Sequence, residues 1–529
     1  TWIAGRNTLK VGLEYRTHTF PWNWGDPVGG WFRFHTLGTG GYDAAGNNLS
    51  LTGDPYASFL LGQVHDANQH IPVLAEFHEE YLSPYVNAEL KVGRRLTLTA
   101  GLRFDYQFGR TETDDQYSTF DPNTPNPGAG NLPGALIFAG TGPGRSGRRE
   151  FEKPKKDGWG PRLGFAYRLN DKTTLRGGYG IYYAGVAFNQ FISLPTMGFS
   201  SNPIAFNLTN GLSPAFSLDD GFPTELIRFP PFIDPTFANG GNILWVTEDG
   251  LTQPRFQNWS LTLKRRLTDN IMLDVSYIGN RGSRLSHRWD RRGLDANLND
   301  PAVLELGPAL LYAPADSEAA AEAGIFPPYE GFVGNVAQAL RKYPQYQGIR
   351  SRTNPLGRSQ YHALQIVLEQ RVTRGLQYRV GYTLSRLMND GAENAQGNAW
   401  GYAGVQDPLN WAVEDWGRSM DDTPHVFLVG FTWDLPGPEN ATGWRKALLD
   451  GWNVSGILRY ESGRPLGITM ANDMAGFLFN GVKRPNRVPG ADPVAAGKDF
   501  DPNTGPYLNR DAWADPGPLT FGDAPKWDH

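Results

Sequence analysis

Residues 361–387 read YHALQIVLEQRVTRGLQYRVGYTLSRL, and this stretch decides the fold. Apolar and polar side chains alternate strictly in its second half, with Leu376, Tyr378, Val380, Tyr382 and Leu384 between Gln377, Arg379, Gly381 and Thr383. A period of two predicts a β-strand with one apolar face and one polar face. Residues 361–372 form a comparable segment, and only residues 373–375 separate the two. The stretch therefore predicts an antiparallel hairpin with a short turn.

The same arrangement occurs three more times in the chain. Residues 93–95, 170–172 and 268–270 each join two segments that we expect to be strands. The connections between hairpins are long, at 37 to 81 residues, and comprise residues 109–161, 184–255, 280–360 and 388–424. Outer-membrane barrels show this asymmetry, because short periplasmic turns lie at one rim and long extracellular loops at the other. The fold predicted is an all-β, transmembrane antiparallel β-barrel.

Segment length separates this fold from a soluble alternative. A strand needs about 9 to 11 residues to cross a bilayer, and the predicted strands reach or exceed that length. A soluble β-rich glycan-binding protein would have strands of about five or six residues. Aromatic residues also gather at segment ends, as aromatic girdles at the two membrane interfaces require; examples are Tyr81, Tyr106, Tyr179, Tyr182, Trp433 and Trp452. Length and aromatic placement favour the membrane barrel.

Composition excludes several classes of function. The 49 basic and 54 acidic residues are too evenly balanced to provide a field for nucleic acid. The absence of cysteine excludes thiol catalysis, disulfides and cysteine-ligated metals. His78, Glu79 and Glu80 begin like a zinc-binding helix motif, but Leu82 stands where the second histidine is required. We therefore predict a protein that is not an enzyme and that has no cofactor.

The candidate site lies in the long connection 388–424. Four aromatic residues there could stack on a sugar or peptide substrate; they are Trp400, Tyr402, Trp411 and Trp416. Four carboxylates close to them could supply the oxygen ligands that calcium prefers; they are Glu414, Asp415, Asp421 and Asp422. The alternative is an ordinary long loop whose side chains pack among themselves.

Two other features of the connections lead to expectations. Basic residues crowd positions 145–156 and could meet the phosphates of lipopolysaccharide, although a solvated charged loop is the alternative. Residues 55–62 and 316–323 have the composition of short helices that stop at Gly62 and Gly324.

Several short motifs occur in a characteristic order along the chain. They are QNWSL at 257–261, DVSYIGNRG at 274–282, YHALQ at 361–365, GYTLSR at 381–386, GWNVSG at 451–456 and SGRP at 462–465. In this order and spacing the chain resembles the barrel of Oar-like TonB-dependent receptors. The resemblance implies a 22-stranded barrel preceded by an N-terminal plug and a TonB box. We therefore expect residues 1–529 to be an incomplete outer-membrane barrel domain, without the plug, the TonB box and the last strands.

The resemblance also implies a function and a location. It implies energy-coupled passage of an oligosaccharide, a peptide or a metal chelate across the outer membrane of a Gram-negative-type bacterium. Expected partners are outer-membrane lipid and lipopolysaccharide, a TonB-type energy-coupling protein, and a surface lipoprotein or other envelope partner. Two alternatives stay open. The first is an Oar-like barrel for protein export or surface adhesion, and the second is the soluble glycan-binding protein.

Overall fold

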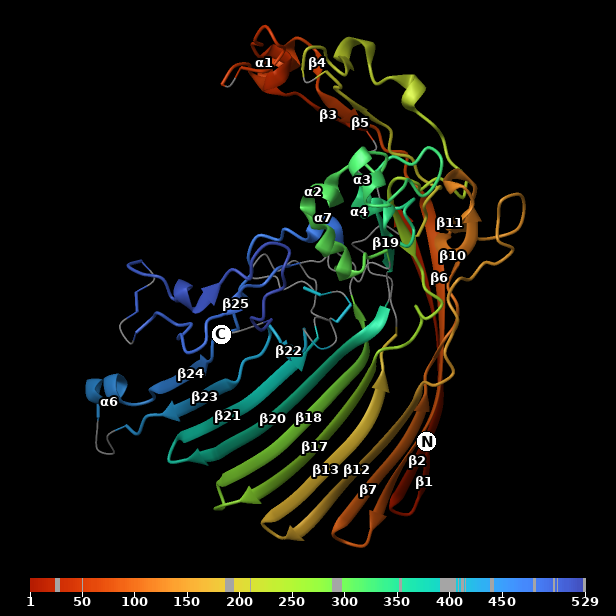
Figure 1. The fold of residues 1–529 in the computed structure, drawn as a ribbon. Helices are drawn as coiled ribbons and strands as arrows, with labels where there is room; N and C mark the ends of the chain where they lie inside the picture. Colours follow the sequence, from red (N-terminus) through yellow and green to blue (C-terminus); the bar gives the residue numbers. More distant parts are fainter. Residues whose placement is uncertain are drawn as a thin grey trace.

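One large curved sheet dominates the computed structural model, and a lobe built from the long connections lies at one end of it (Figure 1). The structure describes residues 1–23, 29–49, 51–185, 195–209, 211–287, 297–351, 354–390, 406–407, 409–410, 413, 415–437, 442–478, 482–497, 500–501 and 503–526. Within these ranges, no helix is both long enough and apolar enough to cross a membrane.

The sheet, which we call the wall, has 15 strands and is antiparallel throughout. Its main path follows the chain order: β1 (Trp2–Ala4), β2 (Asn7–Asn23), β6 (Leu74–Val92), β7 (Leu96–Phe104), β12 (Trp159–Asn170), β13 (Thr173–Tyr183), β17 (Arg255–Arg266), β18 (Ile271–His287), β20 (Asn354–Thr373), β21 (Leu376–Asn389), β23 (His425–Asp434) and β24 (Asn453–Glu461). Three short strands pair beside this path: β8 (Tyr106–Gln107), β9 (Thr111–Glu112) and β22 (Gly417–Arg418). The prediction of an antiparallel all-β fold is confirmed.

Strand register gives the wall an apolar face and a polar face. Val380 on β21 lies opposite Leu368 on β20 and Val429 on β23. Thr383 belongs to the other face and lies opposite Gln365. A slip of one residue would exchange the two faces, so the alternating sequence and the pairing specify each other. The apolar face is the one that a bilayer would contact.

Three of the four turns differ by one residue from the sequence prediction. The turn between β6 and β7 is residues 93–95, as predicted, whereas residues 171–172, 267–270 and 374–375 form the other three. Register shifts next to two of these turns explain their shorter length, because they bring Asn170 opposite Thr173 and Thr373 opposite Leu376. Such register shifts cannot be recognised in the alternation of apolar and polar residues.

Several strands extend past the segments that alternation predicts. β6 begins at Leu74 rather than at residue 81, and β20 begins at Asn354 rather than at 361. The pairing of β2 with β6 runs without a register shift from Thr8 opposite Glu89 to Asn23 opposite Leu74. Backbone hydrogen bonds between neighbouring strands thus continue where the alternation of side chains has ended.

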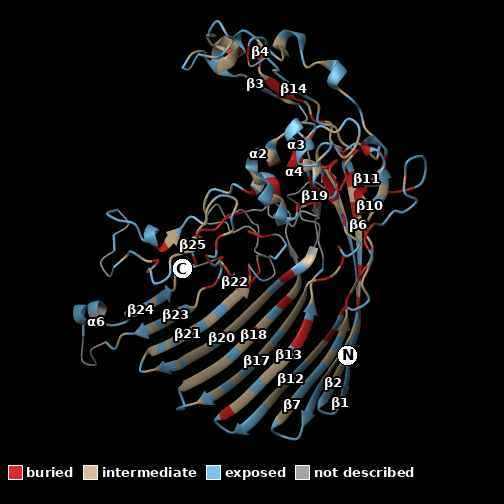
Figure 2. Ribbon diagram, viewed as in Figure 1, coloured by how far each residue is buried: buried red, intermediate tan, exposed pale blue. Residues whose placement is uncertain are grey.

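The lobe has a hydrophobic core of its own. A hairpin of β10 (Ser118–Asn126) and β11 (Leu132–Phe138) packs with a parallel pair, β16 (Asn242–Trp245) and β19 (Gly348–Ser351). Aromatic and aliphatic side chains fill the core, including Phe77, Tyr117, Phe120, Leu136, Phe138, Ile243 and Tyr346. Figure 2 shows the buried residues concentrated here, whereas the wall is mostly intermediate or exposed.

Short elements complete the lobe and the other connections. The helices are α1 (Pro55–Leu60), α2 (Gly307–Tyr312), α3 (Glu318–Glu322), α4 (Val336–Ala339), α6 (Trp444–Leu449) and α7 (Ala475–Leu478). The strands are β3 (Trp31–Arg33), β4 (Gln63–Val64), β5 (Asp66–Asn68), β14 (Ile204–Phe206), β15 (Phe216–Ser217), β25 (Asn486–Arg487) and β26 (Trp513–Ala514). Both predicted loop helices form, and their N-caps are Asp54 for α1 and Ser317 for α3.

Candidate functional site

The polar face of the wall carries ion pairs that link different strands, and the first of them reaches across β6, which lies between β2 and β7. Arg103 on β7 lies 2.6 Å from the Glu14 carboxylate on β2 and 2.7 Å from Asp105. The Asp105 carboxylate also accepts hydrogen bonds from the Tyr81 hydroxyl, at 2.6 Å, and from Ser83. Further along the wall, Lys264 pairs with Asp274 at 3.1 Å. The arrangement presents paired charges on the face opposite to the apolar one, as a water-filled lumen requires.

A buried charge cluster joins the wall to the lobe. The Arg110 guanidinium, 1% exposed, pairs with Glu79 of β6 at 2.7 Å and with Glu152 at 2.8 Å. The Tyr117 hydroxyl also donates to Glu152, at 3.2 Å. Burial acts to lower the pKa of Arg110, but the two carboxylates outweigh it and hold that pKa above its ordinary value. Burial acts in the opposite sense on Glu152 and raises the pKa of that carboxyl despite the attraction of Arg110. The cluster joins three chain segments in a dry environment.

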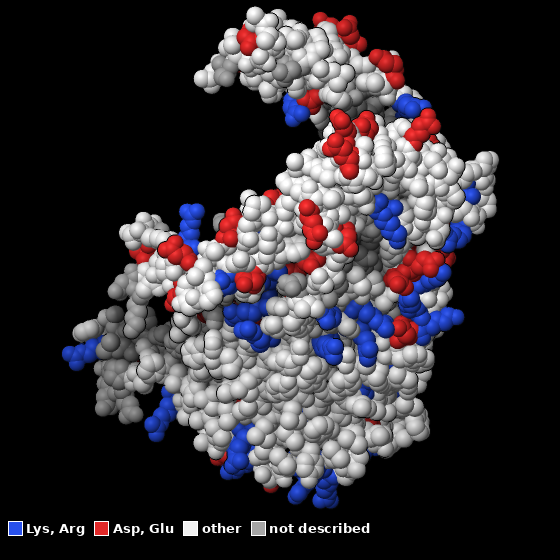
Figure 3. All heavy atoms as spheres, in the orientation of Figure 1, with Lys and Arg blue, Asp and Glu red and all other residues white. Residues whose placement is uncertain are grey.

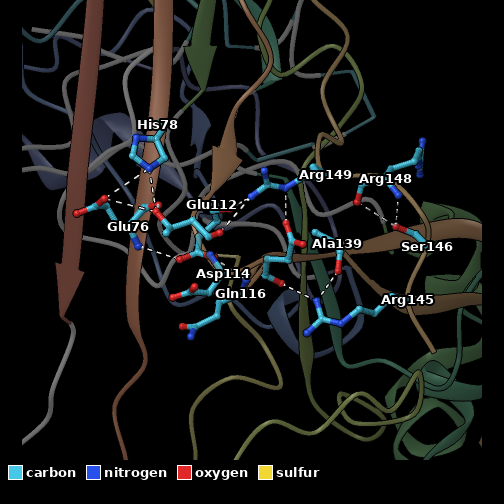
Figure 4. Close-up of polar contacts among 12 residues, drawn as sticks. Glu76, His78, Glu112, Asp114, Gln116, Ala139, Arg145, Ser146, Arg148 and Arg149 are labelled. Carbon is cyan, nitrogen blue, oxygen red and sulfur yellow. Dashed lines mark hydrogen bonds and ion pairs between the residues drawn. The ribbon is translucent and has the colours of Figure 1, made fainter. Parts of the chain in front are cut away.

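A second network in the same region holds the basic residues of the loop (Figure 4). The Glu112 carboxylate accepts from the backbone amides of Glu76 at 2.9 Å and Gln116 at 2.6 Å. Arg149 donates to the Glu112 carbonyl oxygen at 2.5 Å and pairs with Asp115, while Arg145 donates to the Asp115 carbonyl oxygen at 2.9 Å. These two arginines thus contact their own lobe.

The lysines of the same basic segment also have partners. Lys153 pairs with Glu248 at 2.6 Å, and Lys155 pairs with Asp249 at 2.6 Å. Much of the charge that the sequence offers to lipopolysaccharide is therefore matched within the lobe, and a contact with lipopolysaccharide stays a prediction.

A cleft of about 480 Å³ opens between the segments of the lobe. Phe120, Phe151, Trp245 and Leu356 supply apolar walls, and Asp121, Arg148, Glu248 and Asp249 supply charge. Phe120 and Trp245 meet edge to face at 5.7 Å between ring centroids, and the Thr119 hydroxyl accepts from the Val246 amide at 2.7 Å. Sequence reasoning missed this cleft, because its residues come from three separate connections. A concave, mostly apolar site with a few polar groups is the usual form of a ligand site.

The predicted aromatic site can be placed only in part. Trp416 lies half-buried, with the Arg358 guanidinium 5.3 Å from its ring centroid. Trp400, Tyr402 and Trp411 lie outside the described residues. The gathering of these four aromatic residues into one surface stays a prediction.

The described acidic residues of the same connection have basic partners. Asp415 is buried and pairs with Arg484 at 3.0 Å, and Asp422 is buried and pairs with Arg418 at 3.1 Å. Asp421 is exposed and lies 3.8 Å from Arg464, whereas Glu414 is outside the described residues. In the part of the chain that the structure describes, no group of three His, Cys, Asp or Glu side chains could hold a metal ion. The calcium hypothesis therefore has no geometric support from the described carboxylates.

An antiparallel wall with one apolar face, paired charges on the other face and long connections at one end defines the class of outer-membrane β-barrels. Residues 1–528 match the family model of the outer membrane beta barrel domain. The chain belongs to this family, and the protein is located in the outer membrane. The resemblance seen in the motifs agrees with the family at this level.

Solved structures provide more distant similarities. The chain is 10% identical to the alcaligin outer-membrane receptor FauA from Bordetella pertussis, with a TM-score of 0.31, over 86% of this chain and 47% of that one. It is 11% identical to the siderophore receptor PirA from Acinetobacter baumannii, with a TM-score of 0.34, over 86% and 45%. The chain thus spans less than half the length of these two proteins. No curated protein sequence matches it significantly.

Proposed function

We propose that this domain is the barrel wall of a TonB-dependent transporter that carries a substrate across the outer membrane. The two-faced register of the wall supports a lumen, because the polar residues of successive strands all lie on one side. The order of the sequence motifs supports coupling to a TonB-type protein through an N-terminal segment of the whole protein. In such a transporter an energy source opens the lumen, whereas the lumen of a porin is permanently open.

The substrate class that fits best is an oligosaccharide, a peptide or a metal chelate. Apolar faces beside charged groups suit such amphiphilic ligands, and the lobe cleft combines Trp245 and Phe120 with Asp121 and Arg148. The tryptophans of the 388–424 connection would supply the same stacking chemistry. Captured substrate would then pass along the polar face of the wall.

Uptake by cells that express the whole protein tests energy coupling. Accumulation of a labelled substrate should stop when a protonophore collapses the proton gradient, because coupling draws on the inner membrane. Uptake that continues unchanged would indicate an open pore and would contradict the proposal.

A triple substitution tests the tryptophans. Trp400→Ala, Trp411→Ala and Trp416→Ala together should abolish substrate binding, since aromatic stacking is expected to supply much of the contact. The wall should still assemble and remain heat-modifiable on gels. Leu409→Ala, an exposed residue in the same connection, is the matched control. Unchanged affinity in the assembled triple variant would assign these aromatic residues to loop packing.

Protein export or surface adhesion is the second candidate, and the far part of the lobe favours adhesion. The sheet of β3, β5 and β14 lies at the outer end of the lobe, far from the short turns of the wall (Figures 1 and 2). Exposed apolar side chains on and near it include Phe32, Ile204, Phe206 and Leu208. Deletion of residues 201–209 should reduce attachment of cells to a protein-coated surface and leave substrate uptake intact if adhesion is the function.

A further inference from the structure

A cationic pocket lies at the end of the wall where the short turns are. Its volume is about 690 Å³, and five basic side chains line it: Arg6, Lys91, Arg94, Arg95 and Arg168. No Asp or Glu belongs to its described lining. The Glu89 carboxylate lies 3.9 Å from the Lys91 ammonium. Figure 3 shows Lys and Arg side chains at this lower end of the wall. The pocket therefore carries a clear excess of positive charge.

Backbone contacts hold the segments of the pocket in place. The Lys91 amide donates to the Asn7 side chain at 3.0 Å, which fixes the turn that contains Arg6 beside β6. The Arg168 amide donates to the Arg95 carbonyl oxygen at 2.8 Å, which fixes β12 beside the next turn. Like charges repel, and the backbone contacts hold these five cations close together. The positive potential that results attracts an anion.

The register places this pocket on the polar face of the wall. Lys91 lies opposite Thr97, which lies opposite Ala166, and all three belong to the polar register. The apolar register at the same height is formed by Leu90, Leu96 and Tyr167. Lipid headgroups would meet the apolar side, whereas an anion in this pocket must approach from the lumen or from the periplasm. The position therefore favours a polypeptide over a membrane surface.

We propose that this pocket docks an acidic polypeptide segment at the periplasmic mouth of the barrel. Carboxylate side chains suit it, because guanidinium groups bind carboxylates through paired, charge-assisted hydrogen bonds. The five cations come from two neighbouring turns and from strands β6 and β12, so they match several carboxylates along an extended chain better than one small anion. The inference goes beyond the proposed function, since it needs neither a particular substrate nor TonB coupling.

The test uses the whole chain purified in detergent and fluorescein-labelled hexaglutamate as the probe. Arg94→Glu with Arg95→Glu should weaken binding by about tenfold or more, because two attractive contacts become repulsive. Both residues are exposed on a turn, so the wall should still assemble. Binding by the unchanged chain should also weaken steeply between about 50 mM and 500 mM NaCl, where screening shortens the reach of charge.

Controls separate this pocket from general positive charge. Arg371→Glu with Arg374→Glu makes the same charge change at the end of β20 and in the β20–β21 turn, outside the pocket, and should preserve hexaglutamate binding. The neutral variant Arg94→Gln with Arg95→Gln should give an intermediate loss of hexaglutamate affinity. It replaces the charge-reversed variant in the test if charge reversal prevents assembly. Equal affinity in all variants would overturn the proposal. So would undiminished hexaglutamate binding together with lost binding to phosphatidylglycerol nanodiscs, since that result would assign the cations to lipid.

Discussion

The wall and the lobe of this protein meet different solvents, and their side chains differ accordingly. In the wall, Leu384 is 42% exposed and Leu458 is 59% exposed, although both belong to the apolar face. In the lobe, Phe120 is 1% exposed and Tyr346 is fully buried. The wall is one sheet thick and relies on a ladder of backbone hydrogen bonds, with lipid covering its apolar side. The lobe stands in water and must bury apolar surface within itself. Strand register therefore specifies the structure of the wall, and side-chain packing specifies the structure of the lobe.

The largest effect should come from the charge cluster that joins the two regions. Arg110→Ala leaves the buried Glu152 and the largely buried Glu79 without their cation, which should destabilise the lobe by about 3 to 5 kcal/mol. Limited proteolysis should then cut the lobe rapidly while the wall stays heat-modifiable. Arg228→Ala, at an exposed lobe arginine for which the described residues provide no ion pair, should change little. Equal resistance of the two variants would show that the cluster does not hold the lobe.

The wall should be sensitive to charge on one face only. Val380→Arg places a charge on the lipid side near the middle of the strand and should cost about 2 to 4 kcal/mol. Gly381→Arg points to the lumen, and a side chain there meets no atom within 4 Å of its first carbon. Assembly in lipid vesicles, followed by urea titration, measures both. Normal assembly of Val380→Arg together with failure of Gly381→Arg would reverse the assigned faces.

A smaller effect is expected at a pair of rings on the apolar face. The Tyr277 hydroxyl lies 2.7 Å from His362 Nδ1 on the neighbouring strand, and the two rings stack. Tyr277→Phe should cost about 0.5 to 1.5 kcal/mol, the usual net worth of one hydrogen bond. Tyr167→Phe is the control, because the described residues give Tyr167 no hydrogen bond through its hydroxyl. Identical unfolding midpoints would mean that the contact adds nothing to the wall.

The smallest effect concerns pH and the segment after β24. Burial acts to raise the pKa of Asp473, but the Leu519 amide and the Lys483 ammonium outweigh it and hold that pKa below its ordinary value. A lowered folded-state pKa adds stability above the ordinary value of about 3.9, and that stability is lost as pH falls through the lowered value. Acid protease digestion of this segment should therefore accelerate as the pH falls below the ordinary value of about 3.9.

Asp473→Asn is the matched variant for this prediction. It should be cleaved faster than the unchanged chain already at neutral pH, because the Lys483 ammonium, 2% exposed, loses its ion-pair partner. Its cleavage should then vary less between neutral and acid pH. A parallel pH dependence in both chains would locate the titration elsewhere.

Alternation was sufficient to predict the wall, because the face of each side chain depends on its position within its own strand. The parity of residues 376–384 identified Val380 and Gly381 as belonging to opposite faces, and the pairing agrees. Turn lengths were less certain, since a register shift beside Thr373 depends on the neighbouring strand.

The lobe was not predictable in the same way. Arg110 meets Glu152, and Phe120 meets Trp245, across long connections whose spacing carries no signal. The candidate calcium ligands illustrate the limit. Asp415 lies near Asp421 in sequence, but its charge is matched by Arg484, 69 residues away. Proximity in sequence identified the carboxylates, whereas the fold determines which basic residues pair with them.

The uninterrupted pairing of β2 with β6 fixes the height of the lobe above the membrane surface. A strand of 17 residues, the length of β2, is about 56 Å long at about 3.3 Å per residue. Tilted by about 40°, it still rises about 43 Å, against about 30 Å of hydrocarbon. The two strands thus form a rigid support for the lobe, because bending between the membrane and the lobe would break hydrogen bonds of the strand ladder. A bulky molecule arriving from the medium would first contact the lobe, beyond the lipid headgroups. The length of the two strands sets the distance of this contact from the bilayer.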